Sequence, residues 1–112
     1  MDKLVMNKIY CMDCLDGLKM IEDNSIDLVV TSPPYPGASM WSNEGEDIQD
    51  NIKRLTKLSL NVLTECNRVL KEGGVIAWNL QDMPYGDHGI ITTTTTTTTI
   101  YAGQTLGLNL RG

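Results

Sequence analysis

A strand–helix–strand pattern limits the possible folds of this chain more strongly than any other feature. Residues Ile26 to Thr31 form an apolar run centred on Leu28-Val29-Val30, which is typical of a parallel strand covered on both faces. An amphipathic stretch follows from about Asp47 to Lys71, and a second apolar run extends from Val75 to Leu80. Two strands joined through a helix predict a βαβ unit with a mostly parallel sheet, and therefore an α/β fold.

The long helix is predicted from one apolar stripe and a pair of glycines. Its apolar side chains recur at helical spacing: Ile48, Ile52, Leu55, Val62, Leu63, Cys66, Val69 and Leu70. Gly73-Gly74 is a common signal for the C-terminus of a helix, so we expect the helix to end there. Nearer the N-terminus we expect a short strand over Lys8 to Cys11 and a helix over Asp13 to Ile21.

The length and charge of the chain limit what it can do alone. With 112 residues it forms at most one domain, which we expect over residues 1–91. Residues 92–112 are expected to be an irregular, low-complexity tail, because the threonine run 92–99 would set no strand register. The net charge of −5 makes the chain a poor stand-alone binder of phosphate backbones.

Cysteine usage and hydropathy favour a cytoplasmic protein without a metal. The three cysteines make no disulfide framework, and Cys11 and Cys14 lack the second ligand pair of a zinc site. We therefore expect no metal. The N-terminus lacks the apolar core of a secretion signal, and no apolar run is long enough to span a membrane.

The candidate site is the string Ser32-Pro33-Pro34-Tyr35, which directly follows the best-defined strand. Ligands of open α/β sheets bind just outside the carboxyl ends of the strands. Proline has no N–H and stiffens the turn, so the loop presents hydrogen-bond acceptors, while the tyrosine ring offers a flat face. Acceptors beside a stacking ring suit a flipped-out base with an exocyclic amine. The alternative is a Pro-Pro turn with a packing tyrosine.

The neighbouring segments favour the functional alternative. Ile9-Tyr10-Cys11-Met12-Asp13-Cys14-Leu15-Asp16-Gly17-Leu18 and Asn24-Ser25-Ile26-Asp27-Leu28-Val29-Val30 precede the string, and Leu70-Lys71-Glu72-Gly73-Gly74-Val75-Ile76-Ala77-Trp78-Asn79-Leu80 follows the helix. Over residues 7–88 this arrangement resembles the N-terminal catalytic part of the amino-methylating DNA methyltransferases. The resemblance implies a partial Rossmann-like methyltransferase sheet, S-adenosylmethionine as cofactor, and double-stranded DNA with a flipped base as substrate.

The resemblance also implies roles for the four residues of the motif Ser32-Pro33-Pro34-Tyr35, which matches the family's catalytic motif. Ser32 and the Pro33 carbonyl would accept hydrogen bonds from the target amine and hold its lone pair toward the methyl group. Tyr35 would stack on the flipped base. Serine at the first motif position favours cytosine N4 as the target, with adenine N6 second.

Further candidates come from the same resemblance, each with a structural alternative. Asp13 matches an acidic position near the adenosine of the cofactor, and it is equally well interpreted as a helix N-cap. Asn79 and Asp82 would face the cofactor crevice or form a turn at the strand end. Trp41 would stack on DNA, or serve as a lid or partner contact. Lys53, Arg54 and Lys57 are expected to form a solvated basic face.

The chain departs from the family pattern in its cofactor motif. The usual F-x-G-x-G sequence is absent in recognisable form, and residues 101–105 echo it only faintly. We therefore expect a truncated methyltransferase chain that acts with a complementing chain or as a homodimer. A catalytically inactive, methyltransferase-like binding module and a plain βαβ domain are the alternatives. Because half a sheet leaves an open edge, we also expect self-association.

Overall fold

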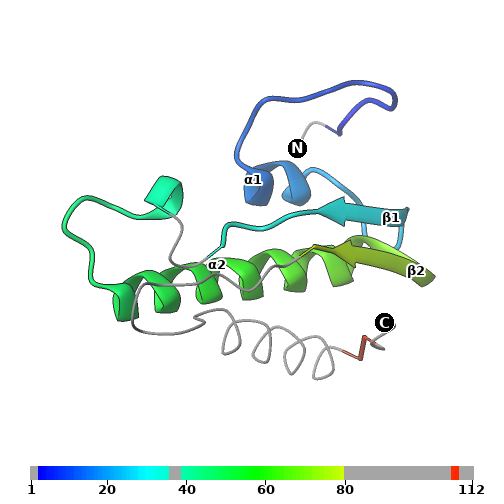
Figure 1. Ribbon diagram of the computed structural model, residues 1–112. Helices are drawn as coiled ribbons and strands as arrows, with labels where there is room; N and C mark the ends of the chain where they lie inside the picture. Colours follow the sequence, from blue (N-terminus) through cyan, green and yellow to red (C-terminus); the bar gives the residue numbers. More distant parts are fainter. Residues whose placement is uncertain (1–2, 36–38, 80–106, 109–112) are drawn as a thin grey trace.

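The structure is a computed structural model that describes residues 3–35, 39–79 and 107–108. Its elements, in chain order, are α1 (Cys14–Lys19), β1 (Ile26–Thr31), the short 3-10 helix η1 (Ser39–Trp41), α2 (Ile48–Val69) and β2 (Leu70–Trp78). The two strands pair in parallel, and α2 connects them and runs alongside the sheet (Figure 1). The predicted βαβ unit and α/β class are confirmed.

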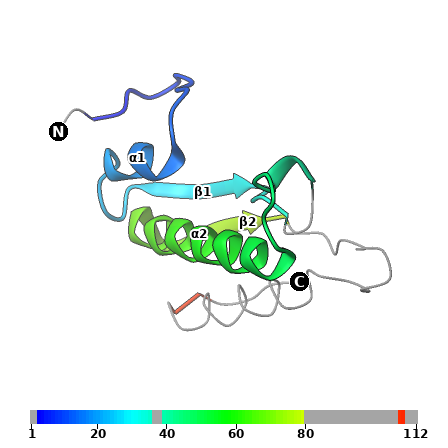
Figure 2. The same cartoon turned by 90° about the vertical axis from the view of Figure 1, so that its left-hand side faces the viewer.

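The core lies between α2 and one face of the sheet. Helix α2 begins after Asp47, whose side chain accepts a hydrogen bond from the Gln49 N–H as an N-cap. Its fully buried positions recur every three or four residues: Asn51, Leu55, Ser59, Leu63, Cys66 and Val69. Most of the predicted apolar stripe is therefore buried, while Ile48, Ile52 and Val62 are half-buried. Figure 2, a view from a second direction, also shows α2 lying along the two strands.

The second face of the sheet is exposed in the described part of the chain. Leu28 and Val30 of β1 are 55% and 72% exposed, and Val75, which pairs with Leu28, is 44% exposed. The prediction that this strand is covered on both faces is therefore wrong for the described residues. The reason is that both described α-helices leave this face uncovered. Helix α2 covers the opposite face, and α1 packs against the C-terminal half of α2, where the Leu18 carbonyl accepts a hydrogen bond from Arg68.

Strand β2 begins five residues earlier than the sequence pattern predicts. It starts at Leu70, directly after α2, so Gly73 and Gly74 lie inside the strand and do not end the helix. Between the first two register pairs, β1 advances from Ile26 to Leu28 while β2 advances from Leu70 to Val75. Gly73, with φ of +79°, lies within this irregular stretch, and a Cβ on Gly74 would lie 2.9 Å from the Lys71 carbonyl oxygen. The glycines permit a bulged start to the strand.

The N-terminal predictions are only partly confirmed. Residues 8–11 are not a strand, since the described part of the chain gives them no neighbouring strand and Ile9 is 97% exposed. Helix α1 spans Cys14–Lys19, which is shorter than the predicted Asp13 to Ile21. The threonine run 92–99 and the division at residue 91 lie outside the described residues. None of the described helices is long and apolar enough to cross a membrane.

Candidate active site

The carboxyl ends of the two parallel strands bring the motif Ser32-Pro33-Pro34-Tyr35 next to Asn79. Strand β1 ends at Thr31 and β2 at Trp78, and these two residues are register partners. The Asn79 N–H donates to the Thr31 carbonyl at 2.9 Å, which extends the pairing by one step. Both segments leave the sheet at this point, so Ser32 and Asn79, 47 positions apart in sequence, share one edge of the sheet.

Three side-chain or backbone groups close a small hydrogen-bonded ring at this edge. Asn79 Nδ2 donates to Tyr35 Oη at 3.2 Å, and Ser32 Oγ donates to the Asn79 carbonyl at 3.4 Å. Ser32 Oγ and Tyr35 Oη lie 3.0 Å apart. Either hydroxyl can donate in this pair, and when the Ser32 proton is directed to the Asn79 carbonyl the Tyr35 hydroxyl donates to Ser32 Oγ. A hydroxyl oxygen has two lone pairs, so Ser32 keeps one for a further donor.

The four residues of the motif differ in how far they are buried. Ser32 is exposed, whereas the ring of Pro33 is buried and Pro34 and Tyr35 are half-buried. The buried proline anchors the turn, and the serine hydroxyl is open to solvent on that anchored turn. Because proline lacks an N–H, the loop offers acceptors with few competing main-chain donors. The edge of the sheet therefore presents hydrogen-bond acceptors on an anchored turn.

The other predicted site residues are placed differently. Asp13 caps α1, since its Oδ1 accepts the Leu15 N–H at 2.9 Å, so the N-cap interpretation is confirmed. Capping uses one carboxylate oxygen and leaves Oδ2 for another donor, so a cofactor role stays a prediction. Within the described residues, no hydrogen bond joins Asp13 to the ring at Ser32. Asp82 lies outside the described residues. Trp41 lies on η1 and is 44% exposed.

Arg54 is exposed on α2 together with Lys53 and Lys57, as expected for a solvated basic face, but its guanidinium is also bonded to the preceding loop. Its guanidinium donates from Nε to Glu46 Oε2 at 2.9 Å and from Nη2 to the Trp41 carbonyl at 2.6 Å. This pair with Arg54 and a bond from Asn51 hold the pKa of Glu46 down at about 2. The sequence pattern missed both Glu46, which lies in the loop before α2, and Asn51, whose only local signal is a polar position on the buried side of the helix.

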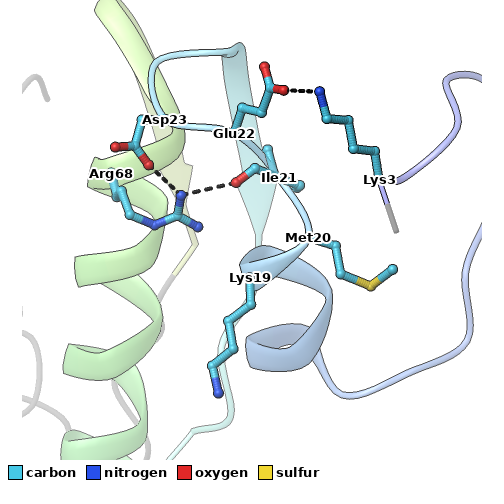
Figure 3. A pocket seen from close by; sticks show the side chains of 7 residues that line it. All are labelled: Lys3, Lys19, Met20, Ile21, Glu22, Asp23 and Arg68. Carbon is cyan, nitrogen blue, oxygen red and sulfur yellow. Dashed lines mark hydrogen bonds and ion pairs between the residues drawn. The ribbon is translucent and has the colours of Figure 1, made fainter. Parts of the chain in front are cut away.

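A pocket of about 360 Å³ lies away from the motif, at the amino end of β1 (Figure 3). It is lined by Lys3, Lys19, Met20, Ile21, Glu22, Asp23 and Arg68. Its charges are largely paired, because Lys3 contacts Glu22 and Arg68 Nη1 lies 2.6 Å from Asp23 Oδ1. Arg68 also donates to the carbonyls of Leu18 and Ile21, so it fastens the loop before β1 to α2.

The described residues offer no metal centre. No three His, Cys, Asp or Glu side chains gather so as to hold a metal ion in residues 3–35, 39–79 and 107–108. Cys11 and Cys14 are exposed free thiols, and Cys66 is a buried free thiol of the core. Burial raises the pKa of the Cys66 thiol, which keeps it protonated and unreactive.

Comparison with known proteins gives a consistent set of relatives. A family model described as DNA methylase, of the N6/N4 methyltransferase type, matches residues 26–107. The chain is 40% identical over 75 residues to the type II methyltransferase M.BglII of Bacillus subtilis, covering 67% of this chain and 19% of that protein. It is 35% identical over 69 residues to M.HpaI of Haemophilus parainfluenzae, covering 62% of this chain and 21% of that protein. The chain spans about a fifth of the length of these relatives.

A solved structure supports the fold. A protein of Thermus thermophilus, named as a DNA modification methylase, superposes with a TM-score of 0.68 at 22% identity. The match covers 86% of this chain and 38% of that one. At this identity the likeness speaks for the architecture of the βαβ unit.

Proposed function

The chain belongs to the N6/N4-type DNA methylase family, and we propose that it methylates an exocyclic amino group of a flipped DNA base. The type II DNA methyltransferases of this family use S-adenosylmethionine as methyl donor. The observation that carries the proposal is the hydrogen-bonded ring of Ser32, Tyr35 and Asn79 at the carboxyl edge of the sheet.

Ser32 acts in this proposal as an acceptor for the target amine. With Ser32 donating to Asn79 and accepting from Tyr35, its oxygen keeps one lone pair, which in this proposal meets an N–H of the amine. The Pro33 carbonyl takes the second N–H. Two fixed acceptors orient the nitrogen lone pair away from the loop, toward the methyl group to be transferred, and orientation of this kind accounts for much of the rate. One N–H proton is lost to solvent after transfer.

Tyr35 supplies the flat surface against which the flipped base stacks. Its hydroxyl is held from two sides, by Asn79 Nδ2 at 3.2 Å and Ser32 Oγ at 3.0 Å. The phenol ring therefore has a defined orientation before a base arrives, so less conformational entropy is lost on binding. Pro34, half-buried between the acceptor and the ring, keeps the two at a fixed spacing.

Cytosine N4 is the proposed target atom, with adenine N6 as the second choice. A neutral serine hydroxyl at the first position of the motif is the feature that favours cytosine. The two outcomes are separated by the product, since digestion of methylated DNA yields either N4-methylcytosine or N6-methyladenine. We propose the cytoplasm as the place of this activity.

The residues present fit S-adenosylmethionine in the chemistry of their donors and acceptors. When bound, this cofactor supplies an activated methyl group. Asp13 retains one carboxylate oxygen for a hydroxyl, and Asn79 retains its amide oxygen at the strand end. With Asp82, which lies outside the described residues, these are the proposed contacts. A homodimer or a complementing chain is proposed to supply further contacts to the cofactor.

A labelled methyl-transfer assay tests the proposal. The chain, with and without the cofactor-binding half of a relative, is incubated with labelled S-adenosylmethionine and cytosine-containing duplex DNA. We expect label in N4-methylcytosine that falls by about 100-fold or more in Ser32→Ala and Tyr35→Ala, as for loss of groups that orient the reacting atoms. Ser25→Ala is the matched control, because Ser25 loses a similar hydroxyl bond at the other end of β1.

Two outcomes would contradict the proposal. No transfer, even with the supplied half, together with saturable binding of DNA or cofactor, would identify an inactive binding module. Equal activity in Ser32→Ala and Ser25→Ala would show that the motif is a structural turn.

A further inference from the structure

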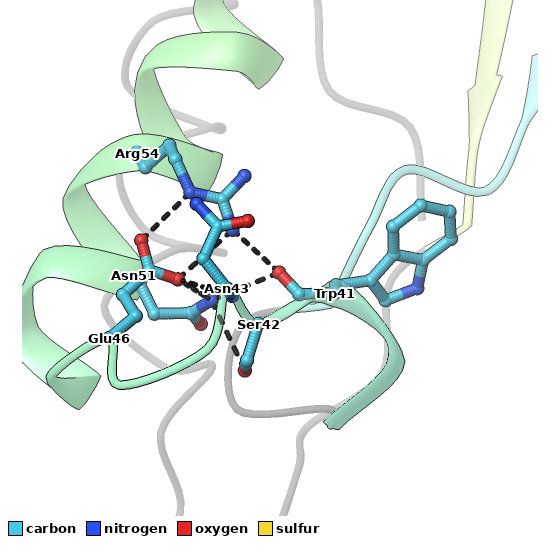
Figure 4. Close-up of polar contacts among 6 residues, drawn as sticks. All are labelled: Trp41, Ser42, Asn43, Glu46, Asn51 and Arg54. Atoms are coloured by element: carbon cyan, nitrogen blue, oxygen red, sulfur yellow. Dashed lines mark hydrogen bonds and ion pairs between the residues drawn. The ribbon is translucent and has the colours of Figure 1, made fainter.

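A polar cluster at the start of α2 holds the loop that follows the motif (Figure 4). Arg54 and Glu46 form a two-bond ion pair, from Nε to Oε2 at 2.9 Å and from Nη2 to Oε1 at 3.0 Å. The Glu46 side chain is only 10% exposed, and its Oε1 also accepts the Asn43 N–H at 3.2 Å. A planar guanidinium facing a carboxylate in this way is geometrically specific, since both charged groups are fixed in orientation.

The cluster converges on one backbone atom, the carbonyl oxygen of Trp41. Arg54 Nη2 donates to it at 2.6 Å and Asn51 Nδ2 at 3.2 Å. Asn51 is 1% exposed, and the same amide nitrogen lies 3.0 Å from Glu46 Oε1. A buried amide is expensive to leave without partners, so its bonds to the loop are strongly maintained. The backbone of an otherwise exposed loop is therefore tied to α2 at Trp41.

The side chains at this fixed point are large, apolar and exposed. Met40 is 79% exposed and Trp41 is 44% exposed, although neither is needed to fill the core between α2 and the sheet. Both views of the fold place η1 beyond the carboxyl end of β1, the end at which Ser32 to Tyr35 emerge (Figure 1, Figure 2). In Figure 4 the Trp41 indole extends away from the cluster. An ordered loop that exposes an aromatic ring beside a binding edge is typical of a contact surface.

We propose that Arg54, Asn51 and Glu46 are positioning residues that hold Trp41 so that its indole stacks on a base of the bound DNA. This inference rests on the function proposed above. It assigns Arg54 a task different from that of Lys53 and Lys57, which are exposed on the same helix. Those two lysines offer charge alone, whereas Arg54 is bonded to the carbonyl of the contact residue.

The first test measures tryptophan fluorescence without DNA, in a Trp78→Phe background. Trp41 is then the one remaining tryptophan of the sequence, so its emission reports on the polar cluster. We expect Arg54→Met to raise the acrylamide quenching of Trp41, because the loop loses its strongest tie to α2. Lys57→Met is the matched control, since it removes the same charge from the same helix without touching Trp41. Glu46→Gln, which weakens the ion pair while keeping the shape of the side chain, serves as a second variant.

The same proteins are then titrated with a duplex oligonucleotide that carries one unpaired cytosine. We expect the oligonucleotide to quench Trp41 emission, and Arg54→Met to weaken its affinity by about tenfold, the size of effect that loss of one stacked base commonly has. Lys57→Met is expected to change affinity by less than about twofold, the size of one screened phosphate contact. In the transfer assay, Arg54→Met raises KM more than it lowers kcat, because stacking binds the ground and transition states alike.

The outcomes separate this inference from the function on which it rests. Unchanged Trp41 quenching in Arg54→Met and Glu46→Gln would overturn the positioning role. Looser Trp41 with unchanged DNA affinity would show that the indole does not contact DNA. A parent protein that neither binds the oligonucleotide nor transfers methyl groups, even with the supplied cofactor-binding half, would instead remove the proposed function itself.

Discussion

At the candidate active site, the Asn79 side chain donates to the hydroxyl of Tyr35, which lies 44 positions earlier in the sequence. We expect Asn79→Ala to lower kcat by about tenfold, because the tyrosine ring loses a bond worth about 0.5–1.5 kcal/mol. The free energy of unfolding should change by no more than that amount, as measured by urea denaturation. Asn61→Ala, at an exposed position of α2, is the control and should leave kcat unchanged. Equal effects of the two variants would show that Asn79 does not act through Tyr35.

The lowered pKa of Glu46 predicts that the folded protein loses stability in acid. Its pKa is about 2 in the folded protein against 4.5 for an unperturbed group, chiefly because of the hydrogen bond from Arg54. A lowered folded-state pKa contributes stability above pH 4.5 that is lost as the pH falls toward 2. We expect the urea midpoint to fall less steeply with pH across that window in Glu46→Gln than in the parent. Parallel pH profiles for the two proteins would argue against a depressed Glu46 pKa.

At the scale of single elements, α2 is the part on which the fold depends most. Leu55 is 1% exposed on the buried side of the helix. Leu55→Ala should lower the free energy of unfolding by about 2–5 kcal/mol, through lost apolar burial and the cavity left behind. Lys53→Ala, two residues away and exposed, should change it by less than about 0.5 kcal/mol. Chemical denaturation followed by circular dichroism measures both, and similar values would contradict this account of the core.

The two strands illustrate how an element can be predicted well or badly. The limits of β1 agree with the sequence because an apolar run ends at two prolines, and both signals are local. The predicted start of β2 was wrong because Gly73 and Gly74 are equally compatible with a helix end and a bulged strand. Pairing with β1 decides that these residues form a strand, and the local sequence pattern holds no information about that pairing.

For the whole molecule, the exposed face of the sheet predicts self-association. Val30 is 72% exposed and lies on the same face as Leu28 and Val75. We expect light scattering to show species larger than a monomer at micromolar concentration, and Val30→Lys to shift them toward the monomer. Met40→Lys is the control, because it changes an exposed apolar residue away from the sheet. A monodisperse parent monomer would contradict the prediction.

Local sequence patterns were enough to establish the βαβ order, the limits of β1, the apolar stripe of α2 and the place of Ser32 to Tyr35 after a strand. These features depend on periodicity and on proline, which act through near neighbours in the chain. The folded chain was needed to show that Asn79 bonds to Tyr35, that Arg54 and Asn51 bond to the Trp41 carbonyl, and that Leu28 and Val30 are exposed. These features join residues distant in sequence, and such contacts depend on how elements pack together, which the pattern within each element does not specify.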